Sequence, residues 1–312
     1  MYTFKYIVYK LWYKFKENKV LILTYKRTSA ILYTKEQNVY NSKRGEKIMK
    51  LGFIGAGNMA KAMMGGIIKN NIFKPEEIIA SDLYVPGLEK AKADLGINVT
   101  TDNKEVAKEA EVLVLSVKPQ FYAAVIEEIK DLIKENQIVV TIAPGKTLDY
   151  LAGAFGHPVK IVRTMPNTPA LVGEGITGVC HNDLVTKEEL DYVCNILSGF
   201  GKAEVLSEKL MDVVVSVSGS SPAYVFMFIE AMADAAVADG MPRAQAYNFA
   251  AQAVLGSAKM VIESGKHPGE LKDMVCSPGG TTIEAVRVLE EKGFRSSVIE
   301  AMKACVRIAR GL

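Results

Sequence analysis

A run of small residues directly after a hydrophobic strand is the feature that most constrains the fold of this chain. The run Gly55-Ala-Gly-Asn-Met-Ala60 follows the apolar segment Leu51–Ile54 without a break and opens a helical stretch. In such a loop the first glycine permits a tight turn, the second lets the backbone approach a pyrophosphate, and the small third residue lets helix and strand pack closely. Free N–H groups at the start of the helix then face the phosphates. The loop predicts a dinucleotide-binding βαβ unit; the alternative is a tight turn that holds no ligand.

Strand and helix patterns alternate from residue 50 to about residue 165. Short runs rich in Val and Ile, without strict alternation, indicate parallel strands buried on both faces. We expect such strands at Leu51–Ile54, Ile78–Asp82, Ile97–Val99, Val112–Val117, Ile138–Ile142 and Val159–Arg163. Polar helical segments such as Pro86–Leu95 lie between them. This part therefore predicts an α/β Rossmann domain, doubly wound around a mostly parallel sheet.

The pattern changes after about Pro169, where helices come to dominate. A strand, a helix and a strand are expected first, at Ile176–Cys180, Lys187–Phe200 and Ala203–Leu206. The long run Ala223–Asp239 is then apolar nearly all round, and such a helix must be covered on most sides. We expect an all-α C-terminal dimerisation domain whose protomers share one core, the alternative being a half that buries itself alone.

Three segments follow from these patterns. We expect residues 1–48 to be an N-terminal extension outside the fold, 49–169 a dinucleotide-binding Rossmann domain, and 170–312 a mainly helical substrate-binding and dimerisation domain. The extension holds eleven Lys or Arg against three Glu, so the rest of a chain of net charge +3 is mildly acidic and a poor candidate for binding nucleic acid. The extension does not resemble a signal peptide. It is either an upstream artefact of start-site choice or a basic arm that binds a surface or membrane.

The sequence contains few residues that could form a metal site or a histidine-based catalytic site. The four cysteines form no CxxC pair, no histidines complete a zinc pattern beside them, and only three histidines occur. We expect no metal, free thiols in a reducing compartment, and a cytoplasmic protein. No apolar run reaches membrane-spanning length, so we expect no membrane partner.

Further residues at predicted strand ends are candidates for the cofactor site, because a dinucleotide lies along the carboxyl edge of the sheet. Asp82 ends the second strand, where a carboxylate can accept from a ribose 2′-hydroxyl and repel a 2′-phosphate; it could also be an exposed turn residue. Val117-Lys118-Pro119 ends the fourth strand and Ala143-Pro144 the fifth, and Lys118 faces either the cofactor or solvent. The expected cofactor is NADPH or NADH.

A second glycine-containing turn, Ser277-Pro-Gly-Gly-Thr-Thr282, lies directly before a predicted helix. Free N–H groups at a helix start suit a small carboxylate, although an ordinary capped helix with Thr281 or Thr282 as N-cap has the same pattern. No carboxylate pair or catalytic histidine is apparent. Hydride transfer to a protonated imine needs little acid–base machinery, because the nicotinamide carries the hard chemistry.

Five blocks together resemble, in order, the motifs of the pyrroline-5-carboxylate reductase family. They are Gly55-Ala-Gly-Asn-Met59, Val117-Lys-Pro-Gln120, Arg163-Thr-Met-Pro-Asn-Thr-Pro169, Ser218-Gly-Ser-Ser-Pro-Ala-Tyr224 and Ser277-Pro-Gly-Gly-Thr-Thr282. The similarity covers essentially all of Met49–Leu312, and the third and fifth blocks are specific to the family. Two features depart from its pattern: Ser221 stands where many members have Gly, and residues 1–48 have no counterpart.

The resemblance implies reduction of 1-pyrroline-5-carboxylate to L-proline by NADPH or NADH, the last step of proline synthesis, in a homodimer that can assemble further. It implies that Ser277, Gly279, Gly280, Thr281 and Thr282 bind the substrate carboxylate, with Thr282 as the catalytic hydroxyl near the imine nitrogen. It places cofactor contacts at the glycine loop (Ile54, Gly55, Ala56, Gly57, Asn58 and Met59), at Asn103, at Val117, Lys118 and Pro119, and around Ala143 and Pro144. Together with Asp82, which the strand-end pattern alone suggests, these are the expected cofactor-binding residues.

Two other functions stay open on the residues alone. A β-hydroxyacid dehydrogenase shares the two-domain plan, but such enzymes place a catalytic lysine on the first long C-terminal helix, and Ala223–Asp239 contains neither Lys nor Arg. A dinucleotide sensor without catalysis would leave the turn Ser277–Thr282 without a purpose.

Overall fold

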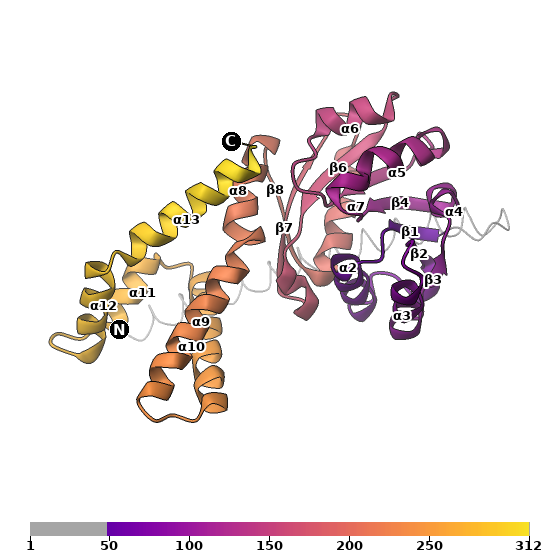
Figure 1. Cartoon of the computed structure of the whole chain (residues 1–312). Helices are drawn as coiled ribbons and strands as arrows, with labels where there is room; N and C mark the ends of the chain where they lie inside the picture. Colours follow the sequence, from indigo (N-terminus) through magenta and orange to yellow (C-terminus); the bar gives the residue numbers. More distant parts are fainter. Residues whose placement is uncertain (1–48, 312) are drawn as a thin grey trace, which may run out of the picture.

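A computed structural model of the chain describes residues 49–311. It has two parts, an α/β lobe built on a sheet and a helical lobe that extends away from it (Figure 1). The expectations for residues 1–48 lie outside the described residues.

The α/β lobe contains one eight-stranded sheet with the strand order β3-β2-β1-β4-β5-β6-β7-β8. The strands are β1 (Met49–Ile54), β2 (Ile78–Ser81), β3 (Asn98–Thr100), β4 (Ala110–Leu115), β5 (Ile138–Thr141), β6 (Lys160–Met165), β7 (Gly175–His181) and β8 (Gly201–Val205). All neighbours run parallel except β6 and β7. The predicted mostly parallel α/β fold is confirmed. The strand order reverses at β1, so a crevice opens between the carboxyl ends of β1 and β4, where ligands of such sheets bind.

Helices cover both faces of the sheet, which explains why its strands are apolar throughout. The helices α2 (Asn58–Lys69), α3 (Val85–Leu95) and α7 (Lys187–Leu197) pack in one hydrophobic cluster. The helices α4 (Asn103–Glu109), α5 (Tyr122–Ile129) and α6 (Leu148–Phe155) pack in the other. Two buried layers hold the strand ends rigid, and these ends carry the predicted cofactor residues.

The sheet continues beyond residue 169, where the sequence patterns placed the end of the Rossmann domain. The predicted strands near residues 176 and 203 are β7 and β8; β7 turns back against β6, with Arg163 opposite Cys180. Their inward side chains, such as Val179, belong to the hydrophobic core of the sheet. The α/β lobe therefore extends to Val205.

The helical lobe starts with a short 3-10 turn, Glu208–Leu210, and contains six helices. One π-helical turn, Val215–Gly219, lies between the first two of them. The helices are α8 (Met211–Val214), α9 (Ser221–Ala238), α10 (Arg243–Ser264), α11 (Pro268–Val275), α12 (Thr281–Glu291) and α13 (Phe294–Ala309). A π-turn inside a helix often marks a functional position.

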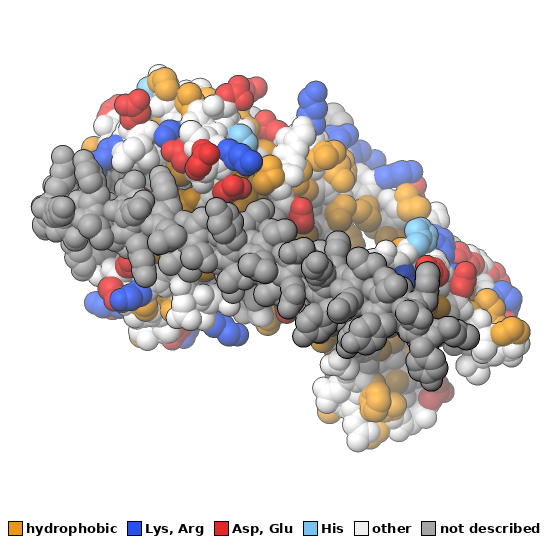
Figure 2. Space-filling model, turned by 180° about the vertical axis from the view of Figure 1, so that it is seen from behind, with side chains coloured by type: hydrophobic (Ala, Val, Ile, Leu, Met, Phe, Trp, Pro, Cys, Tyr) orange, Lys and Arg blue, Asp and Glu red, His pale blue; other side chains and the backbone are white. Residues whose placement is uncertain are grey.

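The surface of this lobe is unusually apolar for a single chain. Phe226, Met227 and Phe249 are 63%, 69% and 68% exposed. The helical run Glu208–Ala238 is long and apolar enough to cross a membrane by length and composition alone. Seen from behind, hydrophobic side chains are also visible on the surface of this lobe, on the right of Figure 2. Exposed apolar surface of this extent marks an interface.

Candidate active site

The glycine loop between β1 and α2 has the geometry that its sequence predicts. Gly55 has φ +101°, and a Cβ there would meet the backbone carbon of Ser116 at 2.8 Å. Gly57 is different, because its backbone is extended and a Cβ added there would have no atom of the described residues within 4 Å. The first glycine is thus required by the protein itself. The open space over the second is room for a ligand, so the loop fits a pyrophosphate.

The ends of β1, β2, β4 and β5 bring the other predicted cofactor residues to the same edge. The Gly55 N–H donates to the Ser81 carbonyl at 2.8 Å, and the Ala56 N–H donates to Asp82 Oδ2 at 2.7 Å. Ile54 and Ala143 are buried beneath this edge, and Val117 and Pro119 are half-buried. Met59 is half-buried, and Asn58, Lys118 and Pro144 are exposed. Asp82 is no free turn residue, since its carboxylate supports the glycine loop.

Asn103 lies at the same edge, but its side chain is hydrogen-bonded to other protein side chains. Its Oδ1 accepts from the Ser81 hydroxyl at 2.8 Å, and its Nδ2 donates to Glu128 Oε2 at 2.8 Å. The amide thus ties the end of β2 to α5. A ligand that contacts Asn103 meets a group already oriented by two hydrogen bonds.

Two supporting residues were missed by the sequence analysis. Ser116 donates its hydroxyl to the Gly55 carbonyl at 2.6 Å and so clamps the glycine loop to the end of β4. Tyr122, which is fully buried, donates to the Leu115 carbonyl at 2.6 Å, and burial raises its pKa to about 12 against the opposing effect of a hydrogen bond with Thr141. Both adjoin the strand-end motif Val117-Lys-Pro119, which was the available signal.

The block Arg163–Pro169 at the end of β6 joins the two lobes. Arg163, only 2% exposed, forms an ion pair with Glu208 at 2.8 Å, and the same carboxylate oxygen accepts from the Leu148 N–H at the start of α6. Asn167 donates to the Ser218 carbonyl in the π-turn at 3.1 Å and accepts from the Ile176 N–H at 2.9 Å. Burial, together with the negative charge of Glu208, raises the pKa of the neighbouring Cys180 thiol to about 11.

The turn Ser277–Thr282 has its helix start uncapped. Gly280 is the N-cap of α12 and makes no side-chain capping hydrogen bond within the described chain, so neither Thr281 nor Thr282 is the N-cap. Gly279 has φ +68°, and a Cβ on Gly280 would lie 2.4 Å from the Ser277 hydroxyl oxygen. The two glycines thus let the turn close tightly on the helix and leave its first N–H groups available to an anion.

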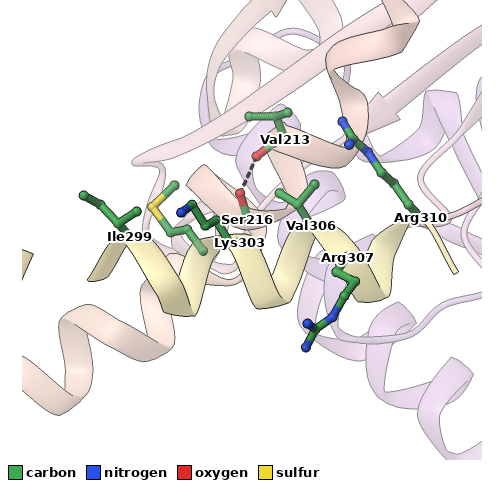
Figure 3. A pocket seen from close by; sticks show the side chains of 8 residues that line it. Val213, Ser216, Ile299, Lys303, Val306, Arg307 and Arg310 are labelled. Carbon is green, nitrogen blue, oxygen red and sulfur yellow. Dashed lines mark hydrogen bonds between the residues drawn. The ribbon is translucent and has the colours of Figure 1, made fainter. Parts of the chain in front are cut away.

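One chain does not bring this turn and the glycine loop together. Helix α12 lies at the end of the helical lobe away from the sheet (Figure 1). A hollow of about 470 Å³ between α8 and α13 also lies apart from the predicted residues (Figure 3). It is lined by Val213, Ser216, Ile299, Met302, Lys303, Val306, Arg307 and Arg310. Within residues 49–311 no group of three or more His, Cys, Asp or Glu side chains is placed to hold a metal ion.

Comparison with known proteins supplies the remaining evidence. Residues 208–312 match a family model described as pyrroline-5-carboxylate reductase dimerisation, and residues 50–145 match one described as NADP oxidoreductase coenzyme F420-dependent. The chain is 58% identical over 260 residues to the pyrroline-5-carboxylate reductase of Escherichia coli (strain K12), covering 82% of this chain and 96% of that protein. The enzyme of Methanosarcina acetivorans is 47% identical over 253 residues, covering 81% of this chain and 94% of that one.

Two solved structures agree with these matches. The pyrroline-5-carboxylate reductase of Coxiella burnetii superposes with a TM-score of 0.79 at 34% identity, covering 85% of this chain and 98% of that one. The enzyme of Plasmodium falciparum, solved with NADP bound, gives a TM-score of 0.77 at 34% identity with the same coverage.

Proposed function

Because this chain belongs to the pyrroline-5-carboxylate reductase family, and is therefore an NAD(P)H-dependent reductase of proline biosynthesis, we propose how its residues divide the work of reducing 1-pyrroline-5-carboxylate. The observation that carries the proposal is that two helices, α2 and α12, each start from a glycine in an extended conformation with no side-chain cap, whereas the N-cap glycine of α13, Gly293, is left-handed. Each helix start can hold an anion on free N–H groups. The reaction has two anionic parts to hold, the cofactor pyrophosphate and the substrate carboxylate.

The α2 end and the surrounding strand ends hold the cofactor. The N–H groups after Gly57 face the pyrophosphate, and Asp82 faces the adenosine ribose. Ile54, Gly55, Ala56, Asn58, Met59 and Asn103 complete the cofactor-binding set on the β1 and β2 side; Val117, Lys118, Pro119, Ala143 and Pro144 complete it toward the nicotinamide. When bound, the reduced nicotinamide supplies a hydride.

The α12 end holds the substrate. Ser277, Gly279, Gly280 and Thr281 bind the carboxylate of 1-pyrroline-5-carboxylate through backbone N–H groups and hydroxyls. Thr282 is the catalytic residue, with its hydroxyl beside the imine nitrogen. The hydride adds to the imine carbon, the C=N double bond becomes a C–N single bond, and the proton on the nitrogen stays there as the amine forms. The protein's task is to hold the two reacting carbons in line.

The separation of the two helix starts within one chain points to an active site shared by two protomers. The helical lobe carries the family's dimerisation domain, so the protein is a homodimer. In a two-fold dimer the α12 turn of one protomer can meet the nucleotide lobe of the other. The sheet ends at Val205 and the dimerisation match begins at residue 208, so we place the boundary between the domains there rather than at residue 169.

Subunit complementation tests the shared site. Gly57→Asp should disable the nucleotide lobe and Thr282→Ala the substrate turn. Co-expressed in equal amounts, the two inactive chains should recover about a quarter of wild-type activity, because half of the dimers are hybrids and each hybrid has one intact shared site. If one chain supplied the whole site, every site in the mixture would carry a defect and no activity would return.

The hydroxyl of Thr282 is tested against that of its neighbour. Thr282→Ala should lower kcat about a hundredfold, because the lost hydroxyl no longer accepts from the imine N–H and the ring is misplaced for the hydride, while cofactor affinity stays unchanged. Thr282→Ser should keep most of the activity because it keeps the hydroxyl. Thr281→Ala is the matched control, with a smaller effect mainly on KM. Equal turnover of Thr282→Ala and wild type would remove Thr282 from the mechanism.

The larger oligomeric state and the cellular location of the enzyme remain predictions. Assembly of dimers into a larger oligomer is tested by light scattering of the eluting protein during size-exclusion chromatography. A cytoplasmic location is tested by cell fractionation.

A further inference from the structure

Asp82 carries a negative charge that is fixed in place at the mouth of the nucleotide crevice. Its Oδ2 accepts from the Ala56 N–H of the glycine loop at 2.7 Å, and its Oδ1 accepts from the Tyr84 N–H at 2.9 Å. The side chain is half-buried. Since both oxygens are engaged with backbone groups, the carboxylate cannot turn away from a cofactor without breaking hydrogen bonds that support the glycine loop.

The segment that follows this carboxylate in the chain carries no free cation to balance a phosphate. Residues 82–88, which lead from β2 into α3, contain no Lys or Arg, and the next basic residue, Lys90, is paired with Asp94 at 2.9 Å. The two residues after Asp82 are instead apolar and exposed, Leu83 at 86% and Tyr84 at 68%. Sites for a 2′-phosphate use a cation here, whereas a carboxylate with spare lone pairs accepts a hydrogen bond from a free ribose hydroxyl.

We propose that Asp82 makes this enzyme select NADH over NADPH, by accepting a hydrogen bond from the adenosine ribose and repelling a 2′-phosphate. The proposal rests on the cofactor site described above. The structure of a relative with NADP bound shows that the fold itself admits the phosphorylated cofactor. The choice between NADH and NADPH therefore depends on the residues at the mouth of the nucleotide crevice, and in this chain the residue there is the carboxylate of Asp82.

Fragments that lack the nicotinamide separate binding from catalysis. Calorimetric titration of the intact dimer with ADP-ribose and with 2′-phospho-ADP-ribose should show that the first binds about tenfold or more tightly, as expected for one unscreened like-charge contact. The kcat/KM values for NADH and NADPH should differ in the same direction.

Two variants test whether Asp82 is the cause. Asp82→Asn keeps a carbonyl acceptor for the glycine loop but removes the charge, and it should bring the two fragment affinities to within about threefold of each other. Leu83→Arg leaves the carboxylate untouched, adds the missing cation at an exposed position, and should strengthen binding of the 2′-phosphorylated fragment. Glu89→Gln, which removes an exposed charge on α3, is the matched control and should leave the ratio unchanged.

The outcomes separate this proposal from the cofactor site on which it rests. If neither fragment binds the wild-type protein, the assignment of the glycine loop fails. If both bind and the phosphorylated one is equal or tighter, or if Asp82→Asn and Leu83→Arg both leave the ratio of affinities unchanged, the selection by Asp82 is overturned.

Discussion

Replacing Gly57 with aspartate should abolish cofactor binding without destabilising the protein. Gly57 is the N-cap of α2, its φ and ψ of −70° and −175° suit any residue, and the added Cβ meets no atom of the described residues within 4 Å. Aspartate is among the best N-cap residues and is slightly better than glycine there. Replacing a glycine in a compatible conformation also stabilises by about 0.4–1 kcal/mol through the unfolded state. The free energy of unfolding of Gly57→Asp should therefore stay level or rise by up to about 1 kcal/mol.

Cofactor binding should respond in the opposite direction. The new carboxylate would occupy the space over the loop, bond to the N–H groups that the pyrophosphate needs, and repel its charge, so the affinity for NADH should fall about a hundredfold or more. Gly57→Ala adds bulk without charge and should give a smaller loss. Titration of the NADH fluorescence and urea unfolding of the same samples measure the two quantities.

Gly55 provides the contrast within the same loop. Gly55→Ala must place a side chain at φ +101° and 2.8 Å from the backbone of Ser116. The positive φ costs about 1–2 kcal/mol and the steric conflict about 1–3 kcal/mol, so the free energy of unfolding should fall by about 2–5 kcal/mol. The reasoning is refuted if Gly57→Asp binds NADH as tightly as wild type, or if it loses as much stability as Gly55→Ala.

Three further predictions concern the support of the site and the extension. Glu208→Gln should lower the free energy of unfolding, measured with urea, by about 1–3 kcal/mol. This is less than the loss for a fully buried pair, because the Glu208 side chain is 31% exposed. The control Glu263→Gln, in an exposed ion pair with Lys259, should change the free energy of unfolding by less than about 0.5 kcal/mol. The folded-state pKa of Tyr122 is raised to about 12 from the usual 10, so its stabilising contribution is complete below pH 10 and is lost as the pH rises toward 12. Tyr122→Phe should remove that part of the alkaline loss, and a flat difference between the two proteins from pH 8 to 11 would contradict it. A chain that starts at Met49 should turn over 1-pyrroline-5-carboxylate as the full chain does, and an inactive truncated chain would give residues 1–48 a role in catalysis.

The geometry of the glycine loop was predictable because its determinants are local in sequence. A tight turn, a close backbone approach and a helix start each require a particular residue within six positions, so the sequence alone is enough to assign Gly55 and Gly57. The alternation of strands and helices predicted a parallel sheet, and in such a sheet the carboxyl ends of β1, β2, β4 and β5 lie at the same edge. The supporting contact of Ser116 with the loop was not predictable, because the two residues are 61 positions apart and a serine at a strand end has many possible partners.

The continuation of the sheet past residue 169 and the contacts of the Arg163–Pro169 block could not be predicted from the sequence for a different reason. A strand at residues 175–181 has the same pattern whether it joins the main sheet or a separate hairpin, and only pairing with β6 decides between them. In the sequence, Arg163 is recognised only as part of a block that resembles a family motif. The structure places it in a buried ion pair with Glu208, and within the described residues its Nε has no hydrogen-bond partner.

The contacts of that block explain how the proposed site between two protomers can be accurate. Hydride transfer requires the reacting carbons to approach to about 3–3.5 Å, yet the α2 and α12 helix starts lie on different lobes of the chain. Their separation in a dimer depends on the interface and on the angle between the lobes within each chain. Arg163 and Asn167 fix that angle from the sheet side. Arg163 holds Glu208 where the helical lobe begins, and Asn167 holds Ser218 in the π-turn ten residues later. A buried charge pair stabilises weakly once its desolvation is counted, but it permits few alternative geometries. The Arg163–Pro169 block therefore lies at the junction between the lobes, and in the proposed dimer it would set how accurately the substrate turn reaches the partner's nucleotide crevice.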